Sequence, residues 1–98
     1  MTSINDLNTQ DKIELLFNNF KAFLKEKNIR YGDSALTPVK IFSKENASNS
    51  IYQRLDDKLS RISNSKGEVK KNDVVDIVGY LCLLLIDKDW LTFDEFLD

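Results

Sequence analysis

The sequence contains no histidine. This absence excludes the Ser-His-Asp and Cys-His arrangements of nucleophilic catalysis, together with every metal site that uses imidazole ligands. Any chemistry must therefore use carboxylates, lysine, tyrosine or a bound ion. The single cysteine, Cys82, excludes a disulfide within the chain. Its neighbours are apolar, which indicates a small packing residue rather than a nucleophile.

Glycine and proline are also scarce, with three and one in 98 residues. Frequent turns are therefore not expected, and a few long helices fit better than a β-sandwich. The length predicts one domain, residues 1–98. A domain this small buries a modest core, so a homo-oligomer would be a natural source of further stability.

Neither sign of charge is in large excess, since the sequence has 14 Lys and Arg residues and 16 Asp and Glu residues. A nucleic-acid-binding surface would be basic, so no nucleic-acid partner is expected. The longest apolar run, Val74–Ile86, contains Asp76 and is too short to span a bilayer, so no membrane partner is expected. The polar start, Met1–Asp11, does not resemble a signal peptide. We therefore expect a cytoplasmic protein.

Apolar periodicity predicts an all-α fold of three principal helices plus short ones. After a polar lead-in over residues 1–8, a first helix runs to about Asn28, capped by Asn8 or Thr9. A second runs from about Ser50 to Ser63, and a third from a cap at Asn72 to about Ile86. Their apolar stripes consist of Ile13, Leu16, Phe17, Phe20 and Leu24 in the first helix and Ile51, Leu55, Leu59 and Ile62 in the second.

The remaining segments lack a sustained period. Between the first two helices, Gly32 indicates a tight turn, and Val39, Ile41 and Phe42 predict a short helix or turn. Residues 87–98 form an aromatic and acidic C-terminal segment. Within it, Thr92 and Glu95 fit a capping box for a short helix over Phe93–Leu97.

Two polar stripes stand out on the second and third helices. On the second, Arg54, Asp57 and Arg61 share one side, with Lys58 at the edge of the apolar face. They form either a solvated face with ion pairs or part of a site. The third helix is apolar almost all round, which predicts burial in a core or at a subunit interface. Its exception is one stripe, at i, i+3 and i+7, that consists of Asp73, Asp76 and Tyr80.

Three blocks of sequence resemble a known family. The blocks are Tyr31-Gly32-Asp33-Ser34, then Arg54–Ile62, then Asp73-x-x-Asp76-x-x-Gly79-Tyr80-Leu81. In this order and at this spacing they resemble the nucleotide modification associated domain family, small proteins common in phages and prophages. That family looks distantly related to the all-α, MazG-like nucleoside triphosphate pyrophosphohydrolases. The resemblance covers about Phe20–Ile86 and implies a compact MazG-like fold in a phage or prophage protein.

MazG-like enzymes bind magnesium with a Glu-Glu-x-x-Glu set on one helix and a Glu-x-x-Asp set on the next. By position, Asp73 and Asp76 match the second set. The first set is poorly matched, because Asp56 and Asp57 point about 100° apart on the helical wheel and cations lie beside them. Shorter carboxylates with interleaved cations favour direct binding of phosphate over gathering magnesium.

The resemblance therefore implies a protein that binds a phosphorylated or cyclic nucleotide without turnover, such as a messenger of bacterial defence. In that role the protein would act against bacterial defence. Arg54, Lys58 and Arg61 would contact phosphate, and Tyr31 or Tyr80 would stack on a base, with Gly32 and Ser34 in the same pocket. Ribose or base donors would be accepted by Asp33, Asp57, Asp73 or Asp76. One alternative is a magnesium-dependent pyrophosphohydrolase in which Asp57, Asp73 and Asp76 hold the ion. Another alternative is an interaction module that blocks a host protein through the aromatic, acidic C-terminal segment.

The Asp73–Asp76–Tyr80 stripe should face either the polar side of the second helix or the Tyr31–Ser34 segment. Carboxylates on so apolar a helix need partners nearby. A structural Asp76 would be paired and sensitive to truncation. A ligand-binding Asp76 would be under-paired, and Asp76→Ala would then abolish nucleotide binding with little change in thermal stability.

Overall fold

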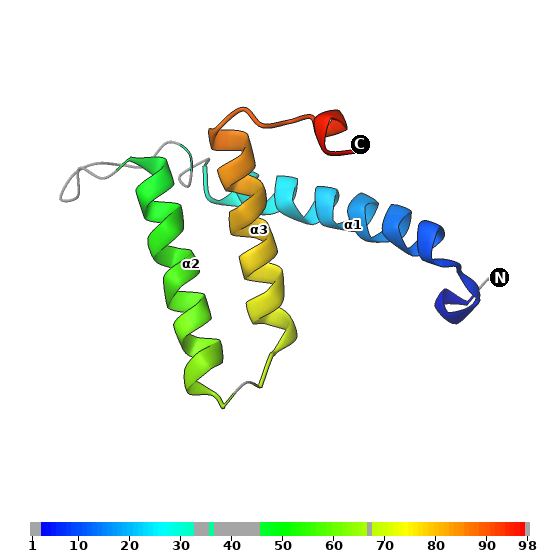
Figure 1. The fold of residues 1–98 in the computed structure, drawn as a ribbon, viewed down its shortest axis with the longest axis horizontal. Coiled ribbons are helices and arrows are strands. Elements are labelled where there is room, and N and C mark those ends of the chain that lie inside the picture. The colour runs from blue at the N-terminus through cyan, green and yellow to red at the C-terminus, as the bar shows by residue number, and fades with distance from the viewer. Residues whose placement is uncertain (1–2, 33–35, 37–45, 67, 98) are drawn as a thin grey trace. The chain divides into compact units, whose positions relative to one another are not determined.

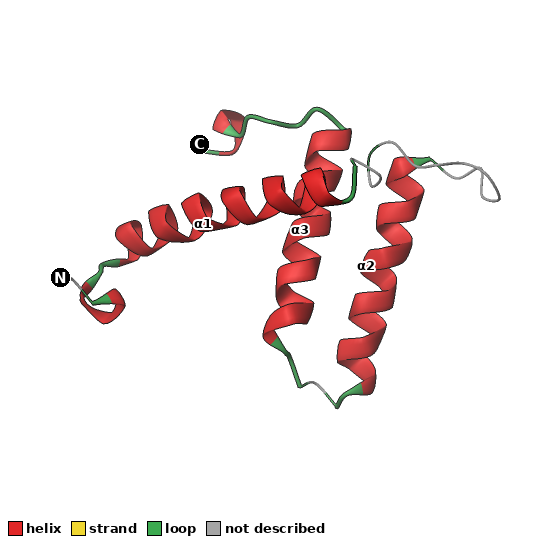
Figure 2. Cartoon of the chain, turned by 180° about the vertical axis from the view of Figure 1, so that it is seen from behind, coloured by secondary structure: helices red, strands yellow, loops and turns green. Residues whose placement is uncertain are grey.

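The computed structural model describes residues 3–32, 36, 46–66 and 68–97. Within these ranges the chain contains only helices and loops, which confirms the predicted all-α class. Three long helices, α1 (Thr9–Arg30), α2 (Ala47–Asn64) and α3 (Lys71–Asp87), are accompanied by the 3₁₀ helices η1 (Ile4–Asp6) and η2 (Asp94–Phe96) (Figures 1 and 2). The short element predicted around Val39–Phe42 lies outside the described residues.

The chain divides into two compact units, Met1–Gly32 and Asp33–Asp98, which are described separately. In the first unit, the Asn8 side chain accepts a hydrogen bond from the backbone N–H of Asp11 at 2.8 Å, so α1 begins at the predicted cap. The helix continues two residues beyond the expected end and is followed by Gly32, whose φ of +60° suits the predicted turn. No residue of α1 is buried.

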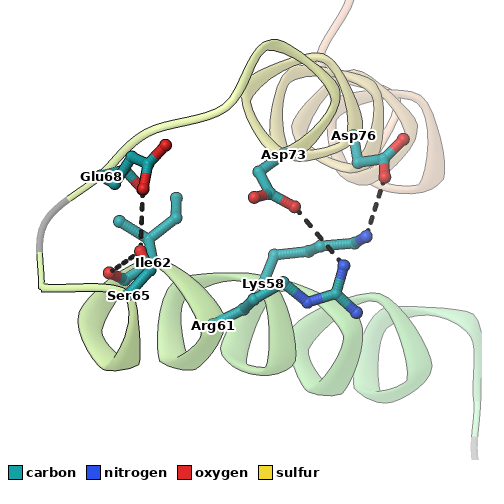
Figure 3. Close-up of polar contacts among 7 residues, drawn as sticks. All are labelled: Lys58, Arg61, Ile62, Ser65, Glu68, Asp73 and Asp76. Atoms are coloured by element: carbon teal, nitrogen blue, oxygen red, sulfur yellow. Dashed lines mark hydrogen bonds and ion pairs between the residues drawn. The ribbon is translucent and has the colours of Figure 1, made fainter.

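The second unit is built on an antiparallel hairpin of α2 and α3, which lie side by side (Figure 1). Helix α2 begins three residues before the predicted start, because the Asn46 side chain caps it by accepting from the Asn49 N–H at 2.9 Å. At its other end the Ser65 hydroxyl lies 2.8 Å from the carbonyl oxygens of both Ile62 and Glu68 (Figure 3). That hydroxyl stabilises the turn into α3.

Two predicted caps are wrong. Lys70 occupies the N-cap position of α3 without a side-chain hydrogen bond, and Asn72 lies inside the helix. The expected capping box of Thr92 and Glu95 is also not formed, because the last element is a single 3₁₀ turn with Phe93 at its N-cap position. Both errors concern short-range choices between neighbouring residues, which the apolar pattern does not resolve.

Few side chains of the hairpin are buried. Among the described residues, the buried apolar side chains are Ala47 and Ile51, both on α2. On α3 the buried residue is Asp73, which is 3% exposed, whereas Val78 is 39% exposed and Leu81 46%. The prediction of burial around the circumference of α3 therefore fails for the single chain, since this helix turns a polar stripe toward α2 and leaves apolar side chains outside.

A hydrogen bond joins the beginning of α2 to the end of α3, at the end of the hairpin away from the connecting turn. The Ser48 hydroxyl, in the first turn of α2, donates to the Asp87 carboxylate, at the last residue of α3, over 2.5 Å. The carboxylate also lies near the N-terminus of α2, where the helix dipole favours negative charge.

We expect Ser48→Ala to lower the free energy of unfolding by about 1–2 kcal/mol, because it leaves a part-buried carboxylate without this donor. Urea denaturation followed by circular dichroism measures the change. Ser63→Ala, at an exposed position of the same helix, is the matched control and should have little effect. Equal losses in the two variants would show that the Ser48–Asp87 contact does not stabilise the hairpin.

Candidate functional site

Three cationic side chains of α2 meet three polar side chains of α3. Arg54 contacts Tyr80, Lys58 contacts Asp76 and Arg61 contacts Asp73. Each set recurs at intervals of three and four residues, so each occupies one stripe of its helix. Because the helices run antiparallel, the first cation meets the last polar residue. Of the two predicted alternatives, the α3 stripe thus faces α2, and these six residues are called the ionic stripe.

Lys58 and Asp76 form the tightest pair of the ionic stripe. The Lys58 Nζ lies 2.8 Å from Asp76 Oδ2, and the two side chains are 17% and 28% exposed (Figure 3). At this distance the contact is a charge-assisted hydrogen bond, partly withdrawn from water. Asp76 is therefore well paired, which fits the structural interpretation of this carboxylate rather than that of a group held ready for a ligand.

Asp73 is the under-bonded carboxylate. Its side chain is 5% exposed, and its Oδ1 accepts no hydrogen bond from the described residues. The nearest cation, Arg61 Nη1, is 3.6 Å from this oxygen, which is an ion pair but too long for a hydrogen bond. The Arg61 side chain is 62% exposed. A buried carboxylate oxygen thus lies beside an exposed guanidinium group, with which it forms a long ion pair (Figure 3).

The third pair joins Arg54 to the Tyr80 ring. The guanidinium carbon lies 5.9 Å from the ring centroid, and Nη1 donates to the phenol oxygen over 3.5 Å. Both are contacts at the long end of their ranges. Arg54 therefore lies over an aromatic face without a carboxylate partner in this stripe, and the residue is exposed.

Of the other predicted site residues, Asp57 is the one that lies in the described part of the hairpin. Asp57 is exposed and takes part in none of the ion pairs among the described residues. Tyr31 and Gly32 belong to the first unit, and Asp33 and Ser34 lie outside the described residues. The Ser48–Asp87 contact, by contrast, was not predicted, since neither residue belongs to a periodic polar stripe.

The cysteine agrees with its predicted packing role. Cys82 is half-buried on α3, and burial raises the pKa of its thiol above the ordinary value. A thiol with a raised pKa has less of the reactive thiolate at neutral pH.

The acidic residues of the hairpin do not fit a magnesium site. Across the described ranges there is no group of three or more Cys, Asp or Glu side chains that could hold a metal ion, and Asp57, Asp73 and Asp76 do not form one. Asp73 and Asp76 instead face the cations Arg61 and Lys58, which occupy the place a divalent ion would need.

Among the residues that the structure describes, no helix has the length and apolar character needed to cross a membrane. Comparison of the whole chain with models of protein families, with curated proteins and with solved structures finds no match. Proposals about function therefore rest on the residues of the hairpin and on the resemblance of the three sequence blocks.

Proposed function

We propose that the chain binds a phosphorylated nucleotide, linear or cyclic, along the ionic stripe and does not turn it over. The observation that carries this proposal is the loose pairing of Arg61 with Asp73, at 3.6 Å. An exposed guanidinium group is suited to bidentate contact with phosphate oxygens. The Asp73 Oδ1 lacks a hydrogen bond but is buried, so it would accept from a ribose hydroxyl or a base amino group once Arg61 turns toward the phosphate and uncovers it.

The spacing of the cations adds a second contact. Arg54 and Arg61 are seven residues apart on α2, so their backbone positions differ by about 10 Å along the helix axis. This span is suited to two phosphate groups, or to one phosphate and a base that stacks near Tyr80. Lys58, between them, is already bonded to Asp76 and would supply positive charge rather than a free donor.

Binding without turnover is the form of the proposal that the geometry favours. A pyrophosphohydrolase of the MazG type needs carboxylates gathered around magnesium. In this hairpin the two aligned carboxylates, Asp73 and Asp76, pair with the cations Arg61 and Lys58. Asp57 does not join them in a cluster of acidic side chains. The resemblance to a phage and prophage family supports a nucleotide messenger of bacterial defence as the ligand, sequestered in the host cytoplasm.

A module that binds a host protein is the second candidate. The observation that favours it is the exposure of large apolar side chains in the C-terminal segment, where Trp90 is 58% and Phe96 78% exposed. Acidic residues are interleaved with these side chains. An acidic, aromatic segment of this kind would suit a groove with an apolar floor and a basic rim.

One experiment separates these functions. The protein is incubated with a nucleotide panel, with and without magnesium, and the mixture is analysed by chromatography. Intact nucleotide that stays with the protein is the expected result. Release of pyrophosphate or monophosphate would identify an enzyme and overturn the proposal, and failure to retain any nucleotide would leave the host-binding module.

Substitution of Arg61 localises the site. We expect Arg61→Gln to weaken binding of the retained nucleotide at least tenfold, because it removes the guanidinium group that donates hydrogen bonds to phosphate. The helical circular dichroism spectrum should be unchanged. Arg30→Gln is the matched control, since Arg30 is an exposed arginine on α1 that pairs with Glu26. Equal weakening by both substitutions, measured by isothermal titration calorimetry, would remove the ionic stripe as the binding site.

A further inference from the structure

The hairpin has an uncovered apolar face. At about 100° per residue, Tyr52, Leu55, Leu59 and Ile62 form one stripe of α2, and Val74, Ile77, Val78, Leu81 and Leu85 form one stripe of α3. Five of these side chains are substantially exposed: Tyr52 by 44%, Leu59 by 55%, Val74 by 42%, Val78 by 39% and Leu81 by 46%. Contiguous apolar exposure of this kind marks an interaction surface.

Both stripes lie on the same side of the hairpin. On each helix the apolar stripe is reached from the ionic stripe by a turn of roughly 110–120° in the direction of increasing residue number. The two helices are right-handed and antiparallel, and their ionic stripes face each other. Equal rotations from the ionic stripes therefore place both apolar stripes on the same side of the hairpin. The two stripes therefore form one apolar surface across both helices, which is called the apolar face. The ionic stripe lies beside it, between the two helices.

We propose that the apolar face binds the same face of a second copy of this chain, so that two hairpins pack as layers of a four-helix bundle. The proposal is independent of nucleotide binding. Each hairpin alone buries only Ala47 and Ile51 among the apolar side chains of the described residues, which is a small core for two helices of 18 and 17 residues. Stacking the two layers supplies the core that one layer lacks.

The area of the apolar face is sufficient for such an interface. The five exposed side chains leave roughly 400 Å² of apolar surface per chain, which is within the range of the largest, often functional, apolar patch on a single subunit. Two faces packed together, with their half-buried neighbours, would bury on the order of 1,000 Å², about the least area of a specific interface.

The chemistry of the apolar face also points to a second copy. The nine residues of its two stripes include no charged side chain. A surface without charges offers nothing that selects a different partner by electrostatic complementarity. A two-fold symmetric contact needs only a face that is complementary to itself, and a flat apolar layer whose side chains recur at three- and four-residue intervals meets that condition.

Size-exclusion chromatography with light scattering of the full chain tests the proposal. We expect a mass of twice 11.3 kDa at micromolar concentration, and a melting temperature that rises with protein concentration. A monomeric mass together with a melting temperature independent of concentration would overturn the proposal, and would assign the apolar face to another segment of the chain or to another protein.

Substitution of Leu81 locates the contact. We expect Leu81→Glu to give a monomer that keeps its helical spectrum, because the charge would have to be buried between the layers. Ile86→Glu is the matched control, since Ile86 is 40% exposed on the same helix but lies off the apolar face, and it should remain dimeric. Dissociation by both variants, or by neither, would remove the apolar face as the interface. Should Leu81→Glu fail to fold, the concentration dependence of the wild-type melting temperature still decides the matter.

Discussion

Replacement of Ile51 by alanine should lower the free energy of unfolding by about 3 kcal/mol, enough to unfold much of a small hairpin. Ile51 is 1% exposed and is the most fully buried side chain among the described residues. Its truncation removes apolar contacts and leaves a cavity at a buried position of α2, which the surrounding backbone cannot fill without moving.

Urea denaturation followed by circular dichroism measures this loss. Leu91→Ala is the control, because Leu91 is a large aliphatic residue of the same unit that is 63% exposed. It should change the free energy of unfolding by less than about 0.5 kcal/mol. Similar losses at Ile51 and Leu91 would mean that the contact between α2 and α3 does not form the core described here.

The second large effect is expected at Asp76. Asp76→Asn should lower the free energy of unfolding by about 2 kcal/mol, between the small value of an exposed pair and the 3–5 kcal/mol of a fully buried one. It removes the charge that Lys58 Nζ contacts at 2.8 Å, and the Lys58 side chain is only 17% exposed. The lysine would remain part-buried without its counter-ion.

Asp73→Asn provides the contrast within the same stripe. Its buried Oδ1 accepts no hydrogen bond and Arg61 is 3.6 Å away, so loss of the charge should change stability by less than about 1 kcal/mol. Under the proposed function it should nevertheless weaken nucleotide binding, because the amide oxygen of asparagine is a weaker acceptor than the carboxylate. Thermal melts and calorimetric titrations of both variants test this. If Asp73→Asn is the more destabilising and both variants bind nucleotide normally, the stripe is structural and contains no binding site.

This pair of expectations revises what the sequence indicates about the two carboxylates. Periodicity places Asp73, Asp76 and Tyr80 on one stripe and predicts cations opposite them, and the structure pairs them with α2 in that way. The separation of a ligand-binding role from a structural one was expected at Asp76. The close ion pair lies at Asp76 and the loose one at Asp73, because the depth and register of the hairpin decide which carboxylate reaches a cation closely. The proposed ligand-binding role is therefore tested at Asp73.

Local sequence determined the helical class and most of the element positions. The apolar period of three and four residues and the Asn8 cap are properties of neighbouring residues, so the beginning of α1 is correct. Where several neighbours can cap, as at Asn46, Lys70 and Phe93, the choice depends on how the chain enters the packed hairpin. The predicted starts near Ser50, Asn72 and Thr92 therefore differ from the observed ones.

Only the tertiary structure decided how little of the apolar circumference of α3 is buried. The sequence of this helix is apolar almost all round, so its hydrophobicity favours no particular orientation, and burial of the whole circumference was the natural expectation. In the observed orientation the Asp76 carboxylate lies 2.8 Å from Lys58, and this pairing of a part-buried charge favours the rotation of α3. When the polar stripe of α3 faces α2, the side chains of Val74, Val78 and Leu81 lie away from α2 and are exposed. A chain of ordinary apolar content therefore has an apolar face that the hairpin itself does not cover.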